Sequence, residues 1–168
     1  MKIGVPKEIK PQENRIGLTP DSVKTLTSNG HEVLVQSDGG FEAGFDNSQY
    51  KSAGAKIVDK AEDIFNDAEI IVKVKEPLSD EVKMLRENQI VFTYLHLAAA
   101  KELTKGLVDS KAVCIAYETV TDNNGRLPLL APMSAVAGRM SVQAGAHCLE
   151  KNQKGRGLLL GGAPGVEG

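Results

Sequence analysis

Short runs of branched apolar residues alternate along this chain with segments that carry the punctuation of helices. This alternation constrains the fold more than any other feature, because it is the pattern of a parallel sheet with helices packed on it. Six runs predict strands, at residues 2–5, 32–36, 55–58, 69–74, 89–93 and 112–116. We therefore expect an α/β domain with an open, mostly parallel sheet and flanking helices, and 168 residues are enough to give it a core.

Capping signals predict where the intervening helices begin and end. Thr19 is a suitable N-cap before Pro20, and Gly30 can close the helix that they open. Asp46 and Gln49 have the spacing of a capping box. Further helices are expected over residues 60–67, over 80–87 with Ser79 at the start, and over 101–109.

The pattern changes from Ser134 onwards, where SAVAGRMSVQAGAHCLEKNQ predicts one helix of about five turns. Small residues recur along it at three- and four-residue spacing, which indicates tight helix packing or a subunit contact. The apolar run at residues 158–160 predicts a strand with no helix after it. We therefore expect the chain to stop where another α/β unit would begin.

Three polar residues, Arg15, Lys75 and His96, each follow one of the predicted strands. In an open α/β sheet the carboxyl ends of parallel strands share one edge, and ligands bind in the crevice outside that edge. Two cations and a group that titrates near neutral pH suit a small carboxylate substrate that undergoes proton transfer. We expect the three side chains to converge there.

Each of these residues also has a simpler interpretation. Arg15 can be a solvated surface arginine. Either Lys73 or Lys75 can be a charge on an edge strand, although Lys75 lies nearer the predicted strand end. His96 lies between Leu95 and Leu97, where a lone histidine is more often a satisfied core residue than a catalyst.

The glycine-rich C-terminal segment does not carry a dinucleotide fingerprint. Gly155 and Gly157 start a G-x-G, but Leu160 occupies the third glycine position and the motif precedes a predicted strand. Ser134 is a better candidate for an anion, because a helix N-terminus and a hydroxyl can together receive a phosphate. Simple capping by Ser134 remains the alternative.

Composition argues against several classes of function. The formal net charge is -2 and no basic stripe is present, so we expect no nucleic-acid partner. Cys114 and Cys148 lack the spacing of a metal site or a redox pair, which favours buried free thiols in a cytoplasmic protein. The longest nearly apolar stretch, residues 90–100, is shorter than the ~20 residues that span a bilayer, so we expect no membrane span.

Several motifs together resemble a known family over the whole chain. These are IGVPKEIKPQENRIGLTP, IIVKVKEP, FTYLHLAA, IAYETV, LPLLAPMSAVAGRMSVQAGA and GRGLLLGGAPGVE, which look like the N-terminal half of NAD-dependent alanine dehydrogenases. The nucleotide-binding subunit of proton-translocating transhydrogenase is a near relative of that family. It typically lacks the second lysine of KVKEP and the histidine after the strand, so Lys75 and His96 favour the dehydrogenase.

The resemblance implies roles for four residues. Arg15 and Lys75 would bind the carboxylate of pyruvate or alanine, His96 would be the acid/base beside the substrate, and Ser134 would touch the cofactor diphosphate. Residues 1–131 would form the N-terminal part of a Rossmann-like or flavodoxin-like substrate domain. Residues 132–168 would form a connecting long helix and the start of an NAD-binding domain, whose glycine fingerprint and catalytic aspartate would lie beyond this chain.

The implied reaction is the reversible, NAD-dependent oxidative deamination of L-alanine to pyruvate and ammonia, in a cytoplasmic homo-oligomer that is a hexamer in the family. The resemblance implies no metal, and by itself the chain would be inactive. Two alternatives remain at this point: a noncatalytic carboxylate-binding or oligomerisation fragment, and a transhydrogenase-type nucleotide-binding subunit.

Overall fold

The computed structural model describes residues 1–166, and the chain divides into two compact units, Met1–Val120 and Thr121–Gly168. The first unit contains the whole sheet and five of the α-helices. The second contains one long helix and irregular segments.

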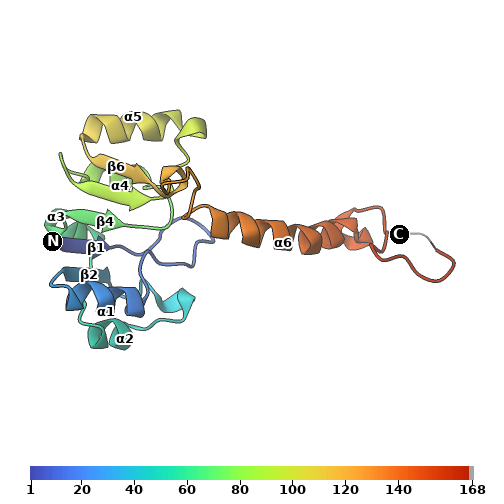
Figure 1. Ribbon diagram of the computed structural model, residues 1–168, viewed down its shortest axis with the longest axis horizontal. Coiled ribbons are helices and arrows are strands. Elements are labelled where there is room, and N and C mark those ends of the chain that lie inside the picture. The colour runs from blue at the N-terminus through green and yellow to red at the C-terminus, as the bar shows by residue number, and fades with distance from the viewer. Residues whose placement is uncertain (167–168) are drawn as a thin grey trace. The chain divides into compact units, whose positions relative to one another are not determined.

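The first unit is built on a six-stranded sheet in which every pairing is parallel (Figure 1). The order of the strands is β3-β2-β1-β4-β5-β6, which is the order of a doubly wound α/β fold. The sequence-based prediction of an open parallel sheet is therefore confirmed. The strands are β1 (Lys2–Val5), β2 (Glu32–Gln36), β3 (Lys56–Val58), β4 (Ile70–Val72), β5 (Ile90–Thr93) and β6 (Val113–Ala116).

Helices cover both faces of this sheet, and strand β2 shows why. Val33 and Val35 point into a core shared with Val23 and Tyr50, which come from the helices after β1 and β2. Leu34, between them, points to the opposite face, which is covered by the helices that follow β3, β4 and β5. The helices are α1 (Pro20–Ser28), α2 (Asn47–Ser52), α3 (Ala61–Asp67), α4 (Ser79–Met84) and α5 (Lys101–Ser110).

The predicted caps are present at α1 and α2. The Thr19 hydroxyl accepts a hydrogen bond from the amide of Ser22, and Asp46 and Gln49 form both bonds of the capping box. Ser79 lies at the start of α4, as predicted, although the helix ends at Met84 and not at Glu87. The carboxylate of Glu81 accepts a hydrogen bond from the amide of Leu78, just before this helix, at 2.9 Å.

The second unit contains helix α6 (Ala131–Leu149), which begins three residues before the predicted start at Ser134. The prediction that Ser134 is its N-cap is therefore wrong, because Pro132 sits inside the first turn and Leu130 takes the cap position. The segment 158–160 was predicted to be a strand, but it is irregular and ends in a turn. A lone strand gains no ladder hydrogen bonds, and the described residues of this unit offer it no neighbouring strand.

The two cysteines differ from each other in their surroundings. Cys114 is half-buried on β6, and burial raises the pKa of its thiol. Cys148 is exposed near the end of α6, so the prediction of a buried thiol is wrong there. Within residues 1–166, no helix is long and apolar enough to cross a membrane.

Candidate functional site

The strand order places the three candidate residues around the point where the sheet changes direction. Strands β1 and β4 are neighbours although they lie far apart in the chain, so the segments that leave their carboxyl ends diverge to opposite faces. Arg15 lies in the segment after β1, Lys75 follows β4 and His96 follows β5. This switch point is where open α/β sheets bind ligands.

A close backbone approach seats the Arg15 segment against the end of β4. Gly17 lies so near this strand that a Cβ built on it would come within 2.5 Å of the carbonyl oxygen of Val72. No side chain fits in that space. The glycine therefore allows the β1–α1 segment to pass directly beside the strand that precedes Lys75.

Arg15 lies at the surface, with 44% of its side chain exposed, but it is held in an ion pair with Glu13. The carboxylate of Glu13 accepts hydrogen bonds from its Nε at 2.8 Å and its Nη2 at 2.6 Å, and also from its backbone amide. The hydrogen bonds from the Arg15 side chain are the main reason that the pKa of Glu13 falls from 4.5 to about 2, and Lys75 lowers it further through its charge. One carboxylate thus already lies in the field of both cations.

Lys75 is half-buried, and the backbone around it is held on both sides. Its amide donates to the carboxylate of Glu8 at 3.2 Å, and its carbonyl oxygen accepts from the hydroxyl of Thr93 at 2.9 Å. Lys73 was the other candidate for an edge charge. It directly follows β4, which is a central strand of the sheet, and its side chain is fully buried. The edge-strand interpretation is therefore wrong for Lys73.

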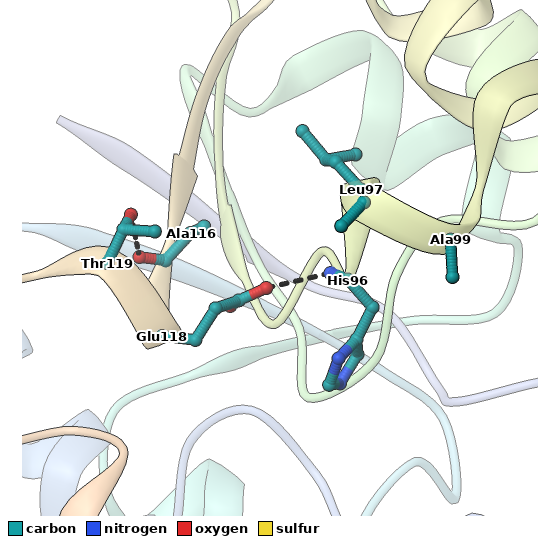
Figure 2. Close-up of a pocket in the computed structure, with 7 residues that line it drawn as sticks. His96, Leu97, Ala99, Ala116, Glu118 and Thr119 are labelled. Atoms are coloured by element: carbon teal, nitrogen blue, oxygen red, sulfur yellow. Dashed lines mark hydrogen bonds between the residues drawn. The ribbon is translucent and has the colours of Figure 1, made fainter.

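His96 is exposed, so it is not a core histidine. Its backbone adopts the left-handed conformation, with φ at +50°, which is uncommon for a residue other than glycine. The carboxylate of Glu118 accepts a hydrogen bond from the amide of His96 at 2.7 Å (Figure 2), and another from the amide of Leu95 at 3.1 Å. Partial burial raises the pKa of Glu118, but these amides and the nearby His96 outweigh it and leave that pKa lowered.

The imidazole borders a hollow of about 400 Å³. Figure 2 shows the ring extending in the opposite direction from the side chain of Leu97. The wall is mainly apolar, with Glu118 and Thr119 as its other polar side chains. A small ligand beside His96 would therefore meet the imidazole and the Glu118 carboxylate against a mainly apolar wall.

Tyr94 links the histidine to the arginine, and sequence reasoning did not single it out. Its ring stacks near the His96 ring, with 6.3 Å between centroids, and meets the Tyr117 ring edge-on at 5.0 Å. Tyr94 also interacts electrostatically with Arg15. The sequence did hold a signal for Tyr94. Residues 92, 94 and 96 are all aromatic, and every second residue of a strand and its extension faces the same side.

Ser134 belongs to the second unit, in the first turn of α6. Its hydroxyl is exposed and makes only a long contact, 3.5 Å, to the carbonyl oxygen of Leu130. That position suits an anion at the start of a helix. Among residues 1–166, no three His, Cys, Asp or Glu side chains are grouped closely enough to hold a metal ion.

Comparison with known proteins identifies the family. A family model described as alanine dehydrogenase/PNT, N-terminal domain, matches residues 4–137. The chain belongs to this family. Curated alanine dehydrogenases from Halomonas elongata and Geobacillus stearothermophilus are 57% and 56% identical to it, each over 99% of the chain. The chain spans 45% of the length of either relative.

Solved structures give the same result for this member of the alanine dehydrogenase/PNT family. An L-alanine dehydrogenase superimposes with a TM-score of 0.88 at 54% identity, covering 99% of this chain and 46% of that one. A transhydrogenase from Sinorhizobium meliloti gives a TM-score of 0.69 at 24% identity over 74% of this chain and 35% of its own, which shows a shared fold alone. The comparisons thus favour the dehydrogenase interpretation over the two alternatives.

Proposed function

We propose that this chain forms the substrate-binding part of an NAD-dependent L-alanine dehydrogenase. The proposed reaction converts L-alanine, NAD⁺ and water reversibly to pyruvate, ammonium, NADH and a proton. The observation that carries the proposal is the placement of Arg15, Lys75 and His96 after β1, β4 and β5 around the switch point. High identity to alanine dehydrogenases supports it.

In this proposal Arg15 and Lys75 hold the substrate carboxylate. A guanidinium can donate two parallel hydrogen bonds to a carboxylate, and an ammonium adds a second positive charge. Glu13 supports this role, because its own carboxylate already receives hydrogen bonds from Arg15 and the electrostatic influence of Lys75. Substrate held in this way would present its Cα in one orientation, and such positioning supplies a large share of rate enhancement.

His96 is the proposed acid/base. Hydride loss from Cα gives an iminium, which water attacks to form a carbinolamine, and the imidazole accepts and returns the protons of these steps. An imidazole suits this work because its ordinary pKa lies near neutrality. Glu118 holds the backbone of His96 in its left-handed conformation and so directs the ring.

The nicotinamide cofactor would supply the hydride acceptor. From this chain we propose Ser134 as a contact to its diphosphate, since the hydroxyl is exposed in the first turn of a 19-residue helix. We also propose the division into a substrate domain over residues 1–131, and a connecting long helix with the start of an NAD-binding domain over 132–168. The protein would be a cytoplasmic homo-oligomer, a hexamer by the family resemblance.

A chimera tests the proposed function. Residues 1–166 would replace the matching 45% of the Geobacillus stearothermophilus relative, which supplies the remainder of a dehydrogenase. We expect L-alanine-dependent NADH formation at 340 nm, and its loss on His96→Ala. A folded chimera with no activity on L-alanine, while the parent relative is active, would refute the proposal.

A further inference from the structure

A buried ion cluster contacts the backbone of Lys75. The ammonium of Lys73 has no exposed surface and contacts the carboxylate of Glu8 at 3.1 Å and that of Glu81 at 2.7 Å. Both carboxylates are nearly fully buried as well. We call Glu8, Lys73 and Glu81 the Lys73 triad.

Glu8 does more than neutralise the charge of Lys73, because it also binds backbone amides. Its second oxygen accepts hydrogen bonds from the amides of Val74, at 2.6 Å, and Lys75, at 3.2 Å. With the Thr93 hydroxyl on the carbonyl oxygen of Lys75, both backbone polar groups of that lysine are occupied. The direction in which the Lys75 side chain leaves the sheet is thereby fixed.

Glu81 does the corresponding work at the other end of the same loop. One of its oxygens binds Lys73, and the other accepts from the amide of Leu78, just before α4. The loop from Lys75 to Leu78 is therefore held at its start by one buried carboxylate and at its end by another. A single ammonium joins the two.

Stability alone is a poor explanation for this arrangement. Removing three charged groups from water is costly, and buried ion clusters can often be replaced by apolar side chains without loss of stability. The triad also carries two carboxylates for one ammonium. What it does provide is a rigid connection between the segment that carries Arg15 and the strand end that carries Lys75.

We propose that Glu8 is a positioning residue of the carboxylate site, holding the backbone of Lys75 so that its ammonium and the Arg15 guanidinium face one ligand. This inference rests on the proposed function and adds a residue to its site. Glu8 does not touch the substrate itself. It acts through the amides of Val74 and Lys75.

Two matched variants separate positioning from a purely structural role. Glu8→Asp and Glu81→Asp each shorten a buried carboxylate on the same ammonium and keep its charge. Glu8→Asp, however, withdraws the carboxylate from the amides of Val74 and Lys75, whereas Glu81→Asp withdraws it from the amide of Leu78. By amide hydrogen exchange we expect Glu8→Asp to accelerate exchange at Lys75 about tenfold and leave Leu78 unchanged, with the reverse pattern for Glu81→Asp.

The second measurement is pyruvate affinity of the full chain, by titration followed in NMR spectra. We expect Glu8→Asp to weaken pyruvate binding about tenfold, as when one charged hydrogen bond is lost, and Glu81→Asp to change it less than about threefold. Equal effects of the two variants, or unchanged affinity in Glu8→Asp, would overturn the inference alone. A wild-type chain that does not bind pyruvate would overturn the proposed carboxylate site, and this inference with it.

Discussion

The Glu13–Arg15 pair predicts a specific loss of stability in acid. The pKa of Glu13 falls from 4.5 to about 2 in the folded chain, chiefly because the Arg15 side chain donates hydrogen bonds to it. A carboxyl whose pKa is lowered by folding stabilises the fold above its unfolded pKa, and this contribution is lost as the pH falls through the folded pKa. The loss should therefore occur between about pH 4.5 and pH 2.

The size of the effect follows from the same two values. A change of the pKa from 4.5 to about 2 corresponds to at most about 3.5 kcal/mol, at ~1.4 kcal/mol per unit. The Arg15 side chain is 44% exposed, so water and salt screen the pair. We expect a contribution of about 1–2 kcal/mol at pH 7.

Urea unfolding of the wild type and Glu13→Gln, from pH 7 down to pH 2, measures this contribution. Glu13→Gln should be less stable by about 1–2 kcal/mol at pH 7, and the two curves should meet near pH 2. Glu62→Gln, which changes an exposed carboxylate on α3, serves as the control and should follow the wild type. A difference that stays constant over the whole pH range would show that Glu13 acts through packing and not through its charge.

Four further predictions concern the site. Arg15→Lys should weaken pyruvate binding by roughly 1.5–3 kcal/mol despite its retained charge, and a double-mutant cycle with Lys75→Ala should show coupling of about 0.5 kcal/mol or more, measured by calorimetry; strict additivity would mean that they bind no common ligand. His96→Ala in the chimera should lower turnover about 10²- to 10⁴-fold with the far-UV spectrum unchanged, and normal turnover would remove its acid/base role. Glu118→Ala should lower the free energy of unfolding by about 1–3 kcal/mol, because the amides of Leu95 and His96 lose a charged acceptor; an unchanged urea midpoint would contradict this. Gly17→Ala should force the β1–α1 segment away from β4 and lower the free energy of unfolding by about 1–3 kcal/mol in the same urea assay. An unchanged free energy of unfolding would show that the backbone approach is not tight.

The sheet was predictable because its strands are signalled locally. Two strands, Lys2–Val5 and Glu32–Gln36, agree with the predicted bounds at both ends, since turn or polar residues flank each apolar run. The predicted strand at residues 158–160 has an equally apolar sequence but is irregular. A strand depends on a neighbour, and no local pattern reports whether one is available.

The site was predictable only in part, for a related reason. Arg15, Lys75 and His96 could be proposed as candidates because each follows a strand, and parallel topology brings strand ends to one edge of the sheet. Glu8 and Lys73 could not, because their contact joins residues 65 positions apart and depends on β1 lying beside β4. In the sequence alone, Lys73 is indistinguishable from a solvated charge.

The long span of these contacts ties the candidate site to the cooperativity of folding. The Glu8 carboxylate and the Val74 amide are 66 positions apart and meet only when the two central strands are paired. An opening that separates them must disrupt the middle of the sheet, so it should resemble global unfolding more than the fraying of a surface loop. Ligand bound there would consequently raise the melting temperature of the whole first unit by mass action. Thermal shift should then report occupancy of the site without any turnover.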